Sequence, residues 1–231
     1  MGAEAVIVGI AGRRGSGKST MARRLLERCH RLVIWDPMAE HSWCPNRLSS
    51  LVRLERFLAW ADPQDSFAAR YVPEQADLVE EFEDVCELVF DYGRLVFGVE
   101  EVAMLCTPGA LPGQFDRLVR LGRHERVSMV WTAQRMVEVA RRLTAATDYF
   151  VLFSHTEPRD LDGIAERCGA GVARQVAELP RHGRVVWNAV EGRTESVDRV
   201  IGELVRMSRD MSGRQVVTSN VTSGDRQVFA G

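Results

Sequence analysis

The stretch Gly12-Arg13-Arg14-Gly15-Ser16-Gly17-Lys18-Ser19 matches the phosphate-binding pattern G-x-x-x-x-G-K-[ST] at every fixed position. Lys18 is the only lysine in the chain, because every other residue among the 30 Lys+Arg is an arginine. A phosphate-binding loop uses a compact ammonium on a thin stem, and a planar guanidinium is a poor replacement for it. A lone lysine at this position therefore supports a functional motif.

The sequence on either side of this loop fits the strand–loop–helix unit that the motif requires. Residues 6–10 form a short apolar run that predicts a buried strand, and residues 19–28 have helical spacing. Backbone N–H groups of the loop and the helix N-terminus would face phosphates. We expect Lys18 to reach the β- and γ-phosphates and Ser19 to ligate Mg²⁺. The residues expected to contact ATP are Gly12, Arg14, Gly15, Ser16, Gly17, Lys18, Ser19 and Thr20.

Composition places the chain among ordinary globular proteins. Its 231 residues are 45% hydrophobic and 27% charged. The net charge is −2, so the chain as a whole does not present a basic surface for binding polyanions. The five cysteines are scattered without a C-x-x-C pair, which indicates reduced thiols rather than a disulfide framework or a zinc site. Neither a transmembrane stretch nor a signal-peptide pattern is present, and we expect a cytoplasmic protein.

Strand and helix signals alternate along the chain. This order predicts an α/β fold with a mainly parallel central sheet and helices on both faces. We expect a single domain over residues 1–207, followed by a polar segment, residues 208–231, that is a flexible tail or an arm contacting a neighbouring subunit. Further strands are predicted at residues 31–37, 67–72, 94–101, 127–134, 148–153 and 184–190, and helices at 47–61, 74–92, 114–122, 137–143, 160–168, 172–179 and 197–207.

Two carboxylates end the apolar strand expected at residues 94–101. Hydrolysis of a nucleotide takes a carboxylate for the magnesium shell and a group that places the attacking water. Glu100 fits the first role and Glu101 the second, although the usual pair is Asp-Glu and Glu100 is one methylene longer. Asp91, after a shorter apolar run, is a competing candidate.

Two further polar residues flank the next predicted strand. Gln134 ends it, and an amide at the carboxyl end of a central strand points at the ligand crevice. Arg123 precedes it, in a series of arginines at three-residue spacing that also includes Arg117, Arg120 and Arg126. One of these arginines, with Arg123 favoured, would stabilise charge on the γ-phosphate of a neighbouring subunit. His155 and His182 are expected to be ordinary polar residues.

The order of these parts resembles the FtsK–HerA superfamily of DNA-pumping ATPases, and within it the small genome-packaging ATPases of icosahedral, membrane-containing viruses. The resemblance covers roughly residues 5–190. The segments that carry it are GRRGSGKS (12–19), VIWDP (33–37), VFGVEE (96–101), GRH (122–124), VWTAQR (130–135), DYFVLF (148–153) and EPRDL (157–161).

This resemblance implies a RecA-like fold and a role for each matching residue. Lys18, Glu101, Gln134 and Arg123 would be the loop lysine, the catalytic glutamate, the sensor glutamine and the trans-acting arginine. Relatives of this kind act as pentameric or hexameric rings around double-stranded DNA. The implied partners are DNA, further copies of the chain and capsid vertex proteins, in the host cytoplasm or the virion. Asp36 is expected to end its strand without a catalytic role.

Other functions remain open on the sequence. A small-molecule kinase would use the arginines of residues 117–126 as a lid over the phosphates. Glu101 argues against this function, because a kinase avoids a residue that activates water. A GTP switch needs a second lysine for its N-K-x-D motif, which the chain lacks. A related ATPase in bacterial DNA transfer or defence shares the same motifs. DNA contacts are expected from arginines near residues 47–56 or 107–117, with steep salt dependence.

Overall fold

The computed structural model describes residues 5–74 and 77–210, and over these residues the strands form one nine-stranded sheet in the order β3-β4-β2-β5-β6-β1-β7-β8-β9. Pairing is parallel from β3 to β7 and antiparallel between β7, β8 and β9. The strands are β1 (Ile7–Ala11), β2 (Arg31–Trp35), β3 (Asn46–Leu48), β4 (Phe67–Tyr71), β5 (Leu95–Val99), β6 (Val127–Ala133), β7 (Tyr149–Phe153), β8 (Arg184–Asn188) and β9 (Arg193–Thr194).

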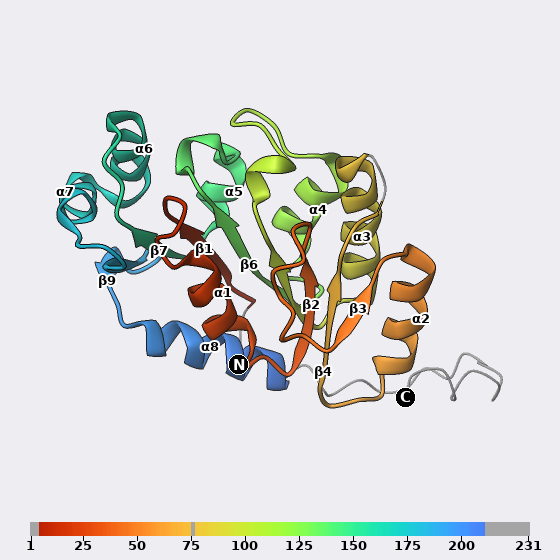
Figure 1. Cartoon of the computed structure of the whole chain (residues 1–231). Helices are drawn as coiled ribbons and strands as arrows, with labels where there is room; N and C mark the ends of the chain where they lie inside the picture. Colours follow the sequence, from red (N-terminus) through yellow and green to blue (C-terminus); the bar gives the residue numbers. More distant parts are fainter. Residues whose placement is uncertain (1–4, 75–76, 211–231) are drawn as a thin grey trace.

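Helices cover both faces of the sheet (Figure 1). Alternate side chains of the buried strands supply the two cores: Leu32 and Ile34 of β2 pack toward α1 and α8, whereas Val33 and Trp35 pack toward α2–α7. The helices are α1 (Lys18–Leu26), α2 (Leu51–Ala61), α3 (Leu78–Tyr92), α4 (Gly113–Leu121), α5 (Arg141–Ala146), α6 (Pro158–Cys168), α7 (Ala170–Glu178) and α8 (Val197–Asp210), with 3-10 turns η1 (Val102–Met104) and η2 (Met136–Glu138).

The strand order determines which loops meet at the carboxyl edge of the sheet. β6 lies between β1 and β5, pairing with β1 through Ala11↔Ala133 and with β5 through Val99↔Trp131. The segments that follow these three strands therefore leave the sheet side by side. The predicted α/β fold with a mainly parallel sheet is confirmed.

Two of the predicted helices were wrong in part. The segment expected to be one helix over residues 47–61 begins with β3, which pairs with β4, and α2 starts only after Ser50, whose Oγ accepts a hydrogen bond from the Arg53 N–H. The segment expected at residues 137–143 is divided between η2 and α5, because Val139 and Ala140 adopt extended ψ angles of 138° and 134°. Tertiary pairing and packing override helical spacing in both places.

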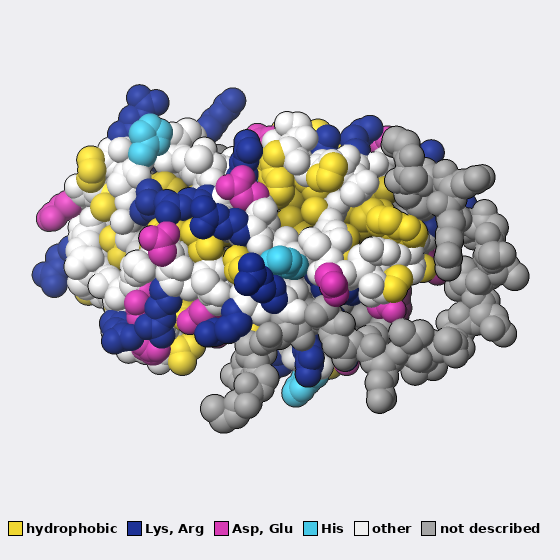
Figure 2. Space-filling view, turned by 90° about the horizontal axis from the view of Figure 1, so that it is seen from below, with side chains coloured by type: hydrophobic (Ala, Val, Ile, Leu, Met, Phe, Trp, Pro, Cys, Tyr) yellow, Lys and Arg dark blue, Asp and Glu magenta, His cyan; other side chains and the backbone are white. Residues whose placement is uncertain are grey.

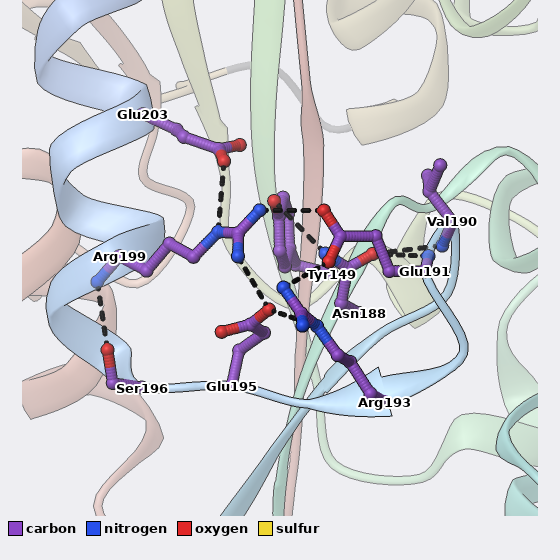
Figure 3. A network of polar contacts seen from close by, with 9 residues as sticks. All are labelled: Tyr149, Asn188, Val190, Glu191, Arg193, Glu195, Ser196, Arg199 and Glu203. Carbon is purple, nitrogen blue, oxygen red and sulfur yellow. Dashed lines mark hydrogen bonds and ion pairs between the residues drawn. The ribbon is translucent and has the colours of Figure 1, made fainter.

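The carboxyl-terminal helix α8 belongs to the domain. Arg199 pairs with Glu191, Glu195 and Glu203, which joins α8 to the β8–β9 hairpin (Figure 3). Because α8 extends to Asp210, the first residues of the expected tail are helical. Ser208 is fully buried and accepts a hydrogen bond from the His30 N–H. The remainder, residues 211–231, lies outside the described residues. In the described ranges, no helix has both the length and the apolar character needed to cross a membrane.

Candidate nucleotide-binding site

The loop between β1 and α1 has the conformation of a phosphate cradle. Gly15 and Gly17 have φ angles of 73° and 107°, in the left-handed region that favours glycine. At Gly12 an added Cβ would lie 2.7 Å from the Phe153 Cβ, so this position also excludes larger residues. Ser16 Oγ is buried and has no hydrogen-bond partner among the residues that the structure describes. An orphaned hydroxyl inside a glycine loop fits an anion such as phosphate.

A pocket of about 500 Å³ opens beside this loop. Its lining includes residues 15–21 of the loop and α1, together with Phe153, His182 and Arg184 from the far side. The volume lies within the range usual for small-molecule sites. Of the residues predicted to contact ATP, those from Gly15 to Thr20 line the pocket, whereas Arg14 is exposed on the loop.

Lys18, Glu101 and Gln134, which come from three separate segments, lie together at the carboxyl edge of the sheet. Gln134 Nε2 donates to Glu101 Oε1 at 3.4 Å, and Lys18 is near enough to act on the charge of Glu101. Burial raises the pKa of Glu101, whereas Lys18 and the Gln134 hydrogen bond oppose that rise. A carboxylate with a raised pKa is a stronger base toward water.

The backbone of Glu101 is strained. Its φ is 49°, a left-handed conformation that costs free energy in a non-glycine residue. The Glu101 N–H donates to Thr132 Oγ1 at 3.0 Å, which holds the residue in place from the neighbouring strand β6. The position of this carboxylate therefore depends on a side chain 31 residues away.

Glu100 is buried, at 6% exposure, and both of its carboxylate oxygens are hydrogen-bonded within the protein. Thr132 Oγ1 donates to Oε2 at 2.6 Å, and His41 Nε2 lies 2.7 Å from Oε1. Trp43 Nε1–H can only donate, and it donates to His41 Nδ1 at 3.0 Å, so His41 carries its proton on Nε2 and donates to Glu100. Glu100 is thus the centre of a buried polar chain.

A third acidic residue, Glu40, lies beside the phosphate loop, and the sequence analysis did not identify it. Ser19 Oγ donates to Glu40 Oε2 at 3.0 Å. His41, which was also missed, follows it directly. The only sequence signal for either residue is its place in the loop after β2, close behind the Asp36-Pro37 pair that ends the strand. Neither lies in a recognisable motif.

Arg123 lies near the amino ends of the central strands, whereas the phosphate loop follows the carboxyl end of β1. It is exposed in the turn before β6 and lines a small cavity with Ile7 and Asp148, at the amino ends of β1 and β7. It therefore cannot act on the phosphate loop of its own chain. Its predicted role in a neighbouring subunit stays a prediction.

Two other arginines near these elements are engaged within the chain. Arg120 pairs with Asp116 at 3.0 Å on α4, and Arg135 pairs with Glu157 and Asp160 at 2.6 and 3.1 Å. The Arg135 contacts join the end of β6 to α6 and so support the backbone beside Gln134.

The two histidines expected to be ordinary polar residues have different environments. His155 is buried, with Nδ1 hydrogen-bonded to the Phe153 carbonyl oxygen at 2.8 Å. His182 is exposed, but its Nδ1 hydrogen-bonds to the Ser16 carbonyl oxygen at 3.0 Å and it lines the pocket. His182 is therefore part of the candidate site.

Neither protein-family models nor curated proteins match the chain, whereas solved structures do. The genome packaging NTPase B204 from Sulfolobus turreted icosahedral virus 2, in complex with ATP-gammaS, has a TM-score of 0.68 and 18% identity over 83% of this chain and 95% of that chain. B204 from Sulfolobus turreted icosahedral virus, a DNA-packaging ATPase, has a TM-score of 0.66 and 16% identity over 84% of this chain and 97% of that one.

A further likeness is to the pCW3 conjugation coupling protein TcpA, in a monomer form with ATPgS. Its TM-score is 0.56 and its identity 12%, over 86% of this chain and 65% of that chain. These solved structures share the fold of this chain, and they confirm the P-loop NTPase fold.

Proposed function

We propose that this chain is an ATPase that couples ATP hydrolysis to movement of double-stranded DNA, most specifically as a viral genome-packaging motor. The observation that carries the proposal is the meeting of Lys18, Glu101 and Gln134 beside a glycine loop and a pocket of suitable volume. The fold shared with a DNA-packaging ATPase supports it. ATP is the proposed triphosphate: a solved structure that shares the fold is in complex with ATP-gammaS, and the chain lacks the second lysine that the guanine-reading motif N-K-x-D needs.

Each residue of the site has a role in this reaction. The glycine loop and Lys18 bind the phosphates, and Glu101 accepts a proton from the water that attacks the γ-phosphorus as its bond to the ADP oxygen breaks. Gln134, bonded to Glu101, orients that water or senses the γ-phosphate. Arg123 of a neighbouring copy stabilises the charge that develops on the transferred group.

The donor set fits a magnesium ion. Ser19 offers a hydroxyl at the start of α1, and Glu40 contacts it. Glu100, which the sequence predicts for the metal shell, contacts His41, the residue after Glu40. When bound, the ion would neutralise negative charge on the phosphates. In the described part of the chain no three His, Cys, Asp or Glu residues form a metal cluster.

DNA and further copies of the chain are the proposed partners, with capsid vertex proteins added for packaging. Figure 2 shows basic and acidic side chains interspersed on the half of the face that carries α8, rather than a field of one sign. DNA contacts are therefore proposed elsewhere, from arginines of residues 47–56 or 107–117, in a ring of five or six copies. The proposed location is the host cytoplasm or the virion.

The test is ATP hydrolysis by the purified protein, measured at low salt with and without linear double-stranded DNA. We expect DNA to stimulate turnover and salt to weaken that stimulation steeply. Lys18→Ala should abolish turnover, whereas Glu101→Gln should bind ATP and hydrolyse it more slowly by two orders of magnitude or so. Hydrolysis that DNA leaves unchanged would reduce the proposal to an ATPase without a DNA role.

A second candidate is an ATPase of bacterial DNA transfer, favoured by the likeness to a conjugation coupling protein. It shares the hydrolytic site and differs in the partner that the motor serves. A small-molecule kinase is a weaker alternative, because Glu101 would direct water to the γ-phosphate. Formation of a phosphorylated small molecule without any DNA requirement would favour the kinase.

A further inference from the structure

The loop after β2, residues 36–41, presents two side chains to the active site. We refer to it as the Asp36 loop. Asp36 is fully buried, and its carboxylate accepts hydrogen bonds from the N–H groups of Glu40 at 2.8 Å and His41 at 3.0 Å. Ala39 has a left-handed φ of 55°, and its N–H donates to the Asp36 carbonyl oxygen. This turn directs Glu40 toward the phosphate loop and His41 toward Glu100.

We propose that Glu40, and not Glu100, is the carboxylate that completes the magnesium shell at Ser19. Ser19 Oγ–H donates to Glu40 Oε2 at 3.0 Å. A serine hydroxyl binds a metal ion through an oxygen lone pair. A carboxylate that accepts the hydrogen bond of the hydroxyl leaves both lone pairs free and makes the oxygen a better ligand. The second oxygen of Glu40 can accept a hydrogen bond from a metal-bound water.

Glu100 has a different part in the same arrangement. Its two oxygens already accept hydrogen bonds from Thr132 and His41, and it is 6% exposed, whereas Glu40 is exposed. To bind a metal-bound water, Glu100 would have to accept a further donor in a site that is already enclosed. Through Thr132, which also accepts the Glu101 N–H, Glu100 positions the backbone of Glu101 instead.

The Asp36 loop thus links the metal side and the hydrolytic side of the site. Arg70 of β4 lies 3.3 Å from the Asp36 carboxylate and balances its buried charge. In this arrangement Asp36 is a positioning residue, and its expected non-catalytic role stays a prediction. This inference rests on the proposed function, since it assigns a metal ligand in the nucleotide site.

The test compares the magnesium dependence of nucleotide binding in four proteins: wild type, Glu40→Gln, Glu100→Gln and the surface control Glu55→Gln on α2. Affinity for a fluorescent ADP is measured with and without Mg²⁺, and Mn²⁺ binding to the ADP complex is followed by electron paramagnetic resonance. We expect Glu40→Gln to bind Mg²⁺ or Mn²⁺ in the complex about tenfold or more weakly than wild type, with metal-free ADP affinity unchanged.

Glu100→Gln is expected to keep the metal affinity and to lose turnover. If Glu40→Gln binds the metal as tightly as wild type while Glu100→Gln does not, the inference is wrong and Glu100 is the metal residue. If wild type itself binds ADP without any effect of Mg²⁺, the proposed function fails first. Circular dichroism of each variant separates metal loss from misfolding, and exposed Glu40 is the residue least expected to perturb the fold.

Discussion

At the residue scale, Thr132 holds two residues of the site in place through its single hydroxyl group. Its hydroxyl donates to Glu100 and accepts the Glu101 N–H, at 2.6 and 3.0 Å. Thr132→Val keeps the shape and removes both bonds. We expect a loss of about 1–3 kcal/mol of stability, because a buried carboxylate loses a donor. We also expect a fall in ATP turnover larger than any change in ATP affinity, because Glu101 is released from its strained position.

The matched control for this prediction is Thr144→Val. The Thr144 hydroxyl is also buried and also bonded within the chain, to Arg141 and Arg167, but it lies on α5. Urea unfolding and steady-state kinetics of both variants are the measurements. Equal turnover in the two variants, after correction for stability, would remove Thr132 from the positioning of Glu101.

A second residue-scale prediction concerns the five cysteines. Burial raises the pKa of Cys29, Cys44 and Cys168 to about 12, and that of fully buried Cys86 upward as well. Because their pKa values are raised, these four thiols stay protonated at pH 8, and a thiol reacts only as its thiolate. With a maleimide at pH 8, we expect the half-buried Cys106 to be labelled first and the others only on unfolding. Rapid labelling of two or more thiols in the native protein, counted by mass spectrometry, would contradict this.

At the element scale, the Arg199 network holds α8 against the β8–β9 hairpin (Figure 3). Arg199→Ala removes the ion pairs that reach from α8 to Glu191 and Glu195, which keep only Arg193, and it leaves Glu203 without the arginine. We expect a lower urea midpoint, with the difference from wild type shrinking as salt is raised, because these groups are partly exposed and screened. Arg206→Ala, on the exposed side of α8, is the control and is expected to leave the midpoint unchanged. Equal midpoints for both variants would show that packing alone holds the helix.

The elements that sequence reasoning located are those whose signal is local. The glycine loop, the apolar strands and the polar residues that end them are readable because period and motif lie within a dozen residues. β3 was missed because three residues carry no period and their strand character comes from pairing with β4. Glu40 and His41 were missed for the same reason: their partners, Ser19 and Glu100, lie 21 and 59 residues away. Proximity of this kind is a property of the folded sheet.

At the scale of the whole molecule, the residues proposed for the site lie at two opposite ends of the sheet strands. Lys18, Glu101 and Gln134 lie at the carboxyl edge, whereas Arg123 lies at the amino edge and can reach a phosphate loop only in another copy. In an assembled ring, Arg123→Ala is therefore expected to slow hydrolysis on the order of 10³-fold, as removal of a trans-acting arginine does. Nucleotide affinity of the isolated subunit should stay unchanged. Arg120→Ala, whose arginine is paired with Asp116 in its own chain, is the control.

Mixing variants separates action in trans from a local effect of the substitution. Lys18→Ala subunits cannot hydrolyse ATP but still carry Arg123, whereas Arg123→Ala subunits keep the phosphate loop intact. In mixed rings, some Arg123→Ala sites face the Arg123 of a Lys18→Ala neighbour, so turnover should rise above that of either variant alone and pass through a maximum as the ratio is varied. A mixture no more active than the sum of its parts, in rings shown to be mixed by native mass spectrometry, would exclude Arg123 as the trans-acting residue.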